Sequence, residues 1–323
     1  TIRDLEMMKS SKLLNKAKKL GYSTATVERW MVLFGEDFTK KLIESYEKGI
    51  PRAIRVNTLS TSNEKLKQQL SIKGFELEDC SLVPNGFWVH KTLFPLGATT
   101  EYLLGYYTIQ GIASQLPALA LDPQPDEKVL DMAAAPGMKA TQIAAMMKNE
   151  GTLVCLDWNQ RRIRALQFNM GRLKVRNQII IRMDSKKVDQ LGIKFDKILL
   201  DAPCTGSGII FKDRSWKKSH SIQDIEHMAN VQKKLLAAGL QVLKKGGRLV
   251  YSTCSLEFEE NEEIISFFLD SGQVIVEKLK LGGKPGLTQF GSKELNKELH
   301  ECQRFFPHIT NTEGFFICSL LKK

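Results

Sequence analysis

The sequence predicts a doubly wound α/β domain with a mostly parallel sheet, preceded by a smaller α+β domain. After residue 105, short apolar segments alternate with segments of ten or more residues that have helical periodicity. Such alternation is typical of parallel strands joined by crossover helices that cover both faces of a sheet. The chain has 323 residues, whereas a single hydrophobic core stops growing at about 250–300 residues. We therefore expect two domains, at residues 1–105 and 106–323.

The first domain is expected to start with helices and to continue as a small α+β unit. Apolar residues recur at helical spacing through residues 4–49, and glycines at 21, 35 and 49 stand where each helix should stop. Pro51 then marks a break. A strand at 53–59, a helix at 62–74 and strands at 75–80 and 86–91 follow.

The second domain is expected to alternate strands and helices. The strands are predicted at 128–133, 152–157, 179–183, 195–201 and 247–254, and the helices at 140–149, 159–174, 222–244 and 261–272. In sheets of this kind, ligands bind outside the carboxyl ends of the strands. The residues that directly follow each strand are therefore the candidates for chemistry.

Positive charge is concentrated in one region of the chain. The 47 Lys and Arg exceed the 36 Asp and Glu, and residues 151–250 alone hold 20 of the basic residues and 8 of the acidic ones. A solvated helix face explains any single basic run in this region. The regional excess favours a polyanion partner such as nucleic acid, and Lys212, Arg214, Lys217 and Lys218 are expected to contact it.

The sequence excludes several classes of protein. No run of eighteen apolar residues occurs, so we expect no membrane span, and residues 1–20 lack the apolar block of a secretion signal. The cysteines form no CxxC pair, so we expect free thiols in a reducing compartment, the cytoplasm, and no structural metal site. These cysteines are Cys80, Cys155, Cys204, Cys254, Cys302 and Cys318.

The ends of the first predicted strands carry small residues and acids. The strand at 128–133 runs into DMAAAPGMK at 131–139, whose small residues allow a ligand to approach the backbone, although a strand-to-helix turn needs them as well. The dinucleotide fingerprint GxGxxG is absent. Asp157 follows the next strand, at the separation from Gly137 that suits a ribose hydroxyl, and Asp184 could reach an adenine amino group. Either acid could instead cap the following helix.

Two cysteines follow the last two strands. Cys204 lies in DAPCTGSG at 201–208, and Cys254 lies in YSTCS at 251–255. If these strands are neighbours, both thiols converge on one pocket. Cys80, Cys155, Cys302 and Cys318 are expected to be inert.

Together these segments resemble a known family. DMAAAPGMK, DAPCTGSG and YSTCSLEFEENE are similar to the three hallmark motifs of the Nop/Sun family of RNA cytosine-5 methyltransferases, which use S-adenosylmethionine. RVNTL at 55–59, DWNQRRIRALQFNMGRL at 157–173 and EGFF at 313–316 support the resemblance, which covers nearly the whole chain. Met138 stands where the family often has glycine. The resemblance implies the Rossmann-like fold of S-adenosylmethionine-dependent methyltransferases.

The resemblance also implies a set of site residues. Cys254 is expected to add to carbon 6 of the cytosine, because a thiolate is both a strong nucleophile and a competent leaving group. Cys204 is expected to help remove the carbon 5 proton, and a partly protonated Asp201 to donate to ring nitrogen 3. The cofactor is expected to contact Ala133, Ala134, Ala135, Pro136, Gly137, Met138, Lys139, Asp157, Arg162, Asp184 and Asp201.

Two of these positions have an alternative role. Lys139 could reach the flipped cytosine or could simply hold the carboxylate of Asp201. Arg162 could contact phosphate instead of the cofactor. The expected function is cytosine-5 methylation of tRNA by a monomer, because the chain is short and has one small accessory domain. The alternatives are the same reaction on ribosomal RNA, an RNA-binding assembly factor without activity, and a methyltransferase for small molecules or proteins.

Overall fold

The first helices of the chain form a unit of their own and pack on the second domain. This computed structural model describes residues 2–212, 217, 221–291 and 293–323, with backbone only for residues 2–10. Helices α1 (Ile2–Lys19), α2 (Thr24–Phe34) and α3 (Glu36–Lys48) come first, and Gly35 and Gly49 end the last two with φ of 86° and 84°. These angles favour glycine, which confirms the predicted helix ends. The unit packs around the buried Trp30 and shares its core with Ile210, Leu256 and Phe306 of the second domain.

A small antiparallel sheet follows the helices. Its order is β2 (Glu76–Asp79), β3 (Gly86–Lys91), β1 (Arg52–Val56) and β4 (Tyr107–Ile109). Helix α4 (Asn63–Ile72) packs on this sheet through Leu66 and Leu70, and η1 (Leu96–Ala98) and α5 (Thr100–Leu103) precede β4. Strand β4 lies beyond residue 105, so the small sheet extends a few residues past the expected division.

The large sheet is doubly wound, as predicted. Its parallel part runs in the order β7 (Gln178–Arg182), β6 (Thr152–Asp157), β5 (Lys128–Asp131), β8 (Phe195–Asp201) and β9 (Leu243–Thr253). Strand β5 has β6 on one side and β8 on the other, so the winding reverses there. A crevice at such a reversal is the usual ligand site of an open α/β sheet.

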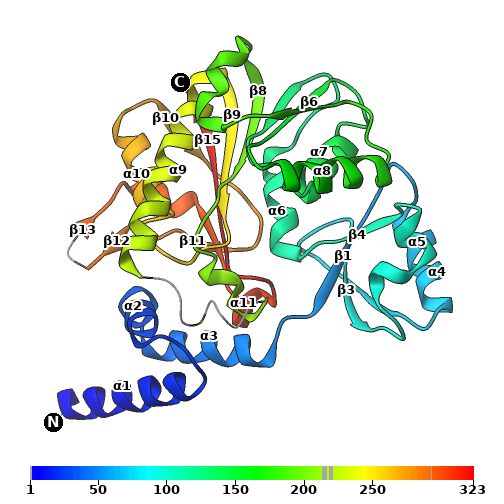
Figure 1. The fold of residues 1–323 in the computed structure, drawn as a ribbon. Helices are drawn as coiled ribbons and strands as arrows, with labels where there is room; N and C mark the ends of the chain where they lie inside the picture. Colours follow the sequence, from blue (N-terminus) through cyan, green and yellow to red (C-terminus); the bar gives the residue numbers. More distant parts are fainter. Residues whose placement is uncertain (1, 213–216, 218–220, 292) are drawn as a thin grey trace.

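Antiparallel strands that the sequence analysis did not predict complete one edge of this sheet (Figure 1). Strand β15 (Phe315–Lys322) pairs with β9, and β10 (Val274–Glu277) and β14 (Gln303–Phe305) pair with its other side. The remaining short elements are β11 (Lys284–Pro285), β12 (Gln289–Phe290), β13 (Lys293–Glu294), η5 (Lys297–Glu301) and α11 (Pro307–Thr310).

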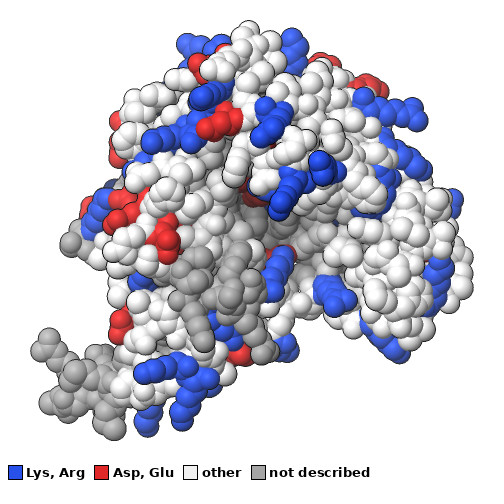
Figure 2. All heavy atoms as spheres, in the orientation of Figure 1, with Lys and Arg blue, Asp and Glu red and all other residues white. Residues whose placement is uncertain are grey.

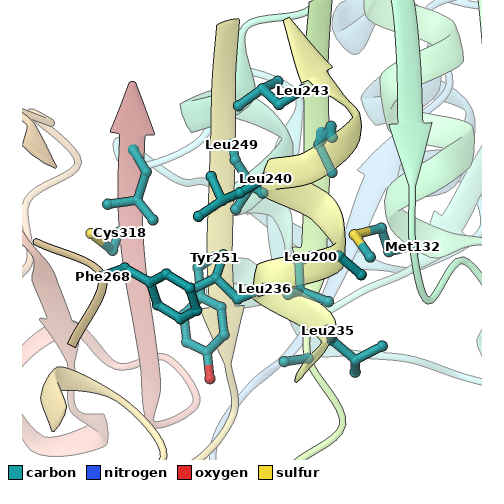
Figure 3. Packing of buried hydrophobic residues seen from close by; sticks show 14 of the residues in the cluster. Met132, Leu200, Leu235, Leu236, Leu240, Leu243, Leu249, Tyr251, Phe268 and Cys318 are labelled. Carbon is teal, nitrogen blue, oxygen red and sulfur yellow. The ribbon is translucent and has the colours of Figure 1, made fainter. Parts of the chain in front are cut away.

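Helices cover both faces of the large sheet. Helices α6 (Ile112–Leu121), α7 (Met138–Met146) and α8 (Gln160–Arg172) share a core with Val129, Leu199 and Val250. Helices α9 (Ile222–Val242) and α10 (Glu262–Asp270), with η2 (Ser185–Leu191), pack on the opposite face against Leu200 and Leu249 (Figure 3). Adjacent strand residues therefore enter different cores, as expected for a sheet buried on both sides.

Within the described residues, no helix is both long and apolar enough to cross a membrane. The four cysteines that were expected to be inert are buried and unpaired by disulfides.

Candidate active site

The two motif cysteines lie side by side at the carboxyl ends of neighbouring strands. Strands β8 and β9 pair in parallel register, with Asp201 opposite Ser252, and each cysteine follows its strand within three residues. The Sγ atoms of Cys204 and Cys254 are 3.3 Å apart, within hydrogen-bonding distance. The predicted convergence of the two thiols on one pocket is therefore confirmed.

The environment of Cys204 keeps its thiol protonated. Its hydrogen bond with Cys254, together with burial and the nearby charges of Glu260 and Asp201, raises the pKa of Cys204 well above its usual range. A thiol that holds its proton this tightly acts as the hydrogen-bond donor of the pair. Cys254 is then the sulfur that accepts this hydrogen bond.

An ion pair between Lys139 and Asp201 lies beside the thiols. The Nζ atom of Lys139 is 2.7 Å from Oδ2 of Asp201 and 3.0 Å from Oγ of Ser114, and the hydroxyl of Ser252 donates to Oδ1 of Asp201 at 2.8 Å. Burial lowers the pKa of Lys139, but the charges of Asp201, Cys254 and Asp131 outweigh it and raise this pKa overall. Lys139 and Ser252 thus both contact the carboxyl group of Asp201, one at each of its oxygens.

A cavity of about 410 Å³ opens at the reversal of the sheet. Its wall contains six of the residues predicted to bind the cofactor: Ala133, Ala135, Asp157, Arg162, Asp184 and Asp201. The cavity also contacts Cys204 and Cys254. The prediction that a ligand site lies among the residues that follow successive strands therefore agrees with the position of this cavity.

The other residues of the first motif that were predicted to bind the cofactor do not line this cavity. Ala134 and Gly137 are buried behind the turn, and Pro136 is exposed. Met138 faces the first domain, since its Sδ accepts a hydrogen bond from Thr108 and its carbonyl accepts one from Arg55. Lys139 lines a different cavity, described below.

Asp157 presents an unpartnered carboxylate oxygen to the cavity. Its Oδ1 accepts the N–H of Asn159 at 2.9 Å, while Oδ2 is buried and accepts no hydrogen bond from any described residue, although Nη1 of Arg162 lies 3.4 Å away. The helix that follows is capped by Asn159 and not by Asp157. A buried acceptor without a donor is suited to a ligand hydroxyl.

Asp184 and Arg162 have protein contacts as well as a place on the cavity wall. Asp184 caps η2 by accepting the N–H of Lys186 at 3.1 Å, so the capping role considered for it is confirmed. The guanidinium of Arg162 donates to the carbonyl of Ala135 and thereby binds α8 to the first motif.

A second, smaller cavity of about 130 Å³ shares Asp201, Ala202 and Cys254 with the first. Lys139 lies on its wall. The other lining residues are Ser114, Ile209, Lys212, Glu313 and Phe315. Two cavities thus meet at Cys254 and Asp201, an arrangement that can hold two reactants on either side of the same thiol.

Sequence reasoning missed several groups that the fold brings to this site. Asp131, the first residue of the first motif, is buried, and burial, together with the charges of Asp201 and Asp157, raises its pKa to about 7 despite the Ala133 N–H and Lys139. Glu313 accepts the N–H of Ala113 at 3.2 Å and pairs with Lys212 at 3.3 Å. The EGFF segment contained Glu313 but carried no indication of its role.

Lys217, in the basic segment after Cys204, does not lie as expected. Lys217 is 7% exposed, and its Nζ is 2.6 Å from Glu47 and 4.6 Å from the centre of the Tyr22 ring. The expectation that Lys217 contacts RNA is therefore wrong, because its charge stabilises the packing of the first helices. Arg214 and Lys218 lie outside the described residues.

Exposed cations gather instead over α8. Figure 2 shows Lys and Arg side chains on this helix beside the hollow in the middle of the face. Arg161 and Arg164 are exposed, and α8 contains no acidic residue. Trp158, which lines the larger cavity, and Phe168 are 68% and 65% exposed. Among the described residues, no cluster of His, Cys, Asp and Glu could hold a metal ion.

Comparisons with known proteins find relatives that cover most of the chain. A family model described as 16S rRNA methyltransferase RsmB/F matches residues 118–321, and one described as the N-terminal domain of 16S rRNA methyltransferase RsmF matches residues 24–111. A solved methyltransferase homolog protein from Pyrococcus horikoshii is 41% identical, with a TM-score of 0.89, and the match covers 97% of this chain and 99% of that one.

Curated relatives are named for both ribosomal RNA and tRNA. The 25S rRNA (cytosine-C(5))-methyltransferase nop2 of Schizosaccharomyces pombe is 39% identical, over 94% of this chain and 51% of the relative. The tRNA (cytosine(72)-C(5))-methyltransferase of Pyrococcus horikoshii is 36% identical, over 78% of this chain and 63% of the relative. The chain thus spans about half the length of the curated relatives it matches.

Proposed function

The chain belongs to the RsmB/F family of methyltransferases, and from this premise we propose that it methylates carbon 5 of a cytosine in RNA, with S-adenosylmethionine as donor. The observation that carries the proposal is the pair of thiols, 3.3 Å apart, at the point where two cavities meet. An assembly factor that only binds RNA needs no such pair of thiols.

The chemistry of the larger cavity fits S-adenosylmethionine. Oδ2 of Asp157 offers a buried acceptor for a ribose hydroxyl, and Asp184 offers an acceptor for the adenine amino group. Ala133 and Ala135 let the ligand approach the backbone. When bound, it supplies an electrophilic methyl group on a sulfonium centre.

Cys254 is assigned the activation of the ring, because cytosine carbon 5 is a weak nucleophile. Its thiolate forms a bond to carbon 6, and the electron pair of the C5=C6 double bond moves to carbon 5. Carbon 5 then takes the methyl group, whose bond to the sulfonium sulfur would break with its electron pair left on that sulfur. Carbon 5 next loses its proton to a base. The electrons of that C–H bond restore C5=C6, and the bond between Cys254 and carbon 6 breaks. The cytosine must leave its stack to reach the thiol.

Cys204, Lys139 and Asp201 are assigned the supporting roles. Cys204 lies next to Cys254 and is assigned as the base for the carbon 5 proton. Its thiol must first lose its own proton to water, and the environment that raises its pKa makes the resulting thiolate a strong base. In the smaller cavity, Lys139 supplies a cationic donor for the ring oxygen and nitrogen that gain negative charge, and Asp201 supplies an acceptor for the amino group.

RNA as the substrate is supported by the surface around the site. The exposed arginines of α8 provide phosphate contacts, and Trp158 and Phe168 offer faces for unpaired bases. We propose tRNA as the first substrate to test, because the archaeal relative is named for tRNA. The fungal relative named for 25S rRNA makes ribosomal RNA the second candidate.

The test is methyl transfer to RNA by the protein and by variants of each thiol. Labelled S-adenosylmethionine is incubated with unmodified tRNA or ribosomal RNA, and 5-methylcytosine is mapped. We expect C254A to abolish transfer and C204A to accumulate a protein–RNA adduct that survives denaturation. C80A, which removes a buried thiol far from the site, serves as the control. Transfer to neither RNA would refute the proposal, and equal loss without adduct in both variants would refute the two roles.

A further inference from the structure

A buried carboxylate, Glu260, binds the segments that follow both site cysteines. Its Oε2 accepts the N–H of Thr205 at 3.0 Å, and its Oε1 accepts the hydroxyl of Ser255 at 2.7 Å and also that of Thr205. Thr205 directly follows Cys204, and Ser255 directly follows Cys254. One carboxylate therefore accepts hydrogen bonds from the residue that follows each thiol.

Other contacts hold Glu260 itself in place. The hydroxyl of Tyr251 donates to the backbone carbonyl of Glu260 at 2.6 Å. Nε2 of Gln232 donates to Oε2 of Glu260 at 2.8 Å and to the carbonyl of Pro203 at 2.7 Å, so it contacts the residue that precedes Cys204 as well. The network thus connects α9, the end of β8 and the end of β9 around one carboxylate.

Burying a charged carboxylate without a counter-ion is energetically unfavourable. Glu260 is 0% exposed, and no Lys, Arg or His forms an ion pair with it in the part of the chain that the structure describes. Its four hydrogen bonds compensate for the lost water, but neutral side chains could pack these segments without that cost. Packing alone therefore does not explain why this position holds a carboxylate that no cation of the described residues pairs with.

We propose that Glu260 is a positioning residue that sets the separation of the two thiols and keeps Cys204 in its protonated form. The inference rests on the proposed function only for its consequence in methyl transfer, since the effect on the thiols themselves needs no RNA. The charge of Glu260 contributes to the raised pKa of Cys204, which is the direction that this role requires.

Two substitutions separate geometry from charge. In E260Q, the amide oxygen can occupy the place of Oε2 and accept the N–H groups of Thr205 and Gln232. The amide nitrogen then faces the hydroxyls of Thr205 and Ser255, which can accept hydrogen bonds. E260Q therefore keeps the contacts and removes the charge, whereas E260A removes both. E257Q is the matched control, because Glu257 is a buried carboxylate of the same segment that binds Arg29 of α2 instead.

The first measurement is the pH profile of alkylation of each thiol by iodoacetamide, read by mass spectrometry on protein without RNA. We expect the Cys204 profile to move to lower pH in E260Q and to remain unchanged in E257Q. An unchanged Cys204 profile in E260Q would overturn the role of the charge. This result does not depend on methyl transfer, so it distinguishes a failure of the inference from a failure of the proposed function.

The second measurement is methyl transfer with both thiols present, together with adduct formation in the C204A background, which reports on Cys254 alone. We expect E260A to lower methyl transfer and adduct formation by about 100-fold, as for a misplaced reacting group, and to leave the affinity for S-adenosylmethionine unchanged. E260Q should keep most of the activity that E260A loses. If E260A does not fold, T205V and S255A replace it, because each removes a single hydrogen bond to Oε1. Methyl transfer at the wild-type rate and adduct formation at the level of C204A alone, in E260A or in both single variants, would overturn the positioning role.

Discussion

The Nζ atom of Lys139 lies 2.7 Å from Oδ2 of Asp201, so the start of α7 and the end of β8 share an ion pair at the wall of the smaller cavity. Since Lys139 does not line the larger cavity, its charge is available to a bound base and not to the cofactor. A variant of Lys139 can therefore distinguish an effect on the bound base from an effect on the cofactor.

We expect K139M and D201N each to reduce single-turnover methyl transfer by about 10²–10⁴-fold, the range for a positioned proton donor or acceptor. In K139M, the affinity for S-adenosylmethionine should be unchanged. The double variant should be no slower than the slower single variant, because the two groups act as a unit. K197M, which removes the partly buried partner of Glu127, is the control. A double variant whose losses multiply would show independent roles.

Asp131 predicts a specific dependence of stability on pH. Its pKa is about 7 in the folded protein, against an ordinary value of 3.8, so the folded state binds more protons between these values. The free energy of unfolding therefore decreases as pH rises from about 4 to 7, and D131N removes this decrease. We expect D131N to gain about 2–3 kcal/mol relative to wild type between about pH 5 and pH 8, at about 1.4 kcal/mol per pKa unit. Urea unfolding at both pH values measures the difference.

The exposed Asp189 provides the control for this measurement, since D189N alters a carboxylate that solvent already stabilises. Its stability difference from wild type should be the same at both pH values. If D131N shows the same flat behaviour, Asp131 does not titrate near neutral pH in the folded protein.

The contact between Lys217 and Glu47 predicts an effect on stability and none on RNA binding. Lys217 Nζ also donates to the carbonyl of Leu20, so K217M removes this hydrogen bond and the cation beside Glu47, whose Oε1 still accepts the hydroxyl of Tyr22. We expect the free energy of unfolding to fall by about 2–3 kcal/mol, below the range for a fully buried pair because Glu47 is partly exposed. Chemical denaturation and RNA affinity are measured on the same variant. Weaker RNA binding without a loss of stability would contradict this prediction and would indicate that Lys217 contacts RNA.

Much of the fold was predictable because its signals are local. The parallel strands are apolar runs buried on both faces, and the ends of α2 and α3 require the left-handed backbone that glycine adopts. The direction of β15 was not predictable, since an apolar run indicates burial and not the neighbour with which it pairs. Strands such as β11 have two residues, too few for any periodicity.

The site was predictable where residues follow strands, and it was not predictable where distant segments meet. The two cysteines and Asp157 occupy strand ends, whereas Ser114 and Glu313 reach the smaller cavity from α6 and from the segment before β15. Lys217 was misassigned for the same reason, because Glu47, with which it forms an ion pair, is 170 residues away in the sequence. A count of charges along the chain cannot distinguish such a lysine from one on the surface.

The arginines of α8 predict where RNA lies. Arg161 and Arg164 are exposed on a helix without acids, next to the cavity that Arg162 and Trp158 line. We expect R161A/R164A to weaken RNA binding without changing cofactor affinity. The slope of log affinity against log salt should fall by about one unit for each phosphate that the variant no longer binds. The control K128A/K245A removes equal charge at the amino ends of β5 and β9, the opposite edge of the sheet. Equal weakening in both double variants would mean that net charge, and not the α8 surface, determines RNA affinity.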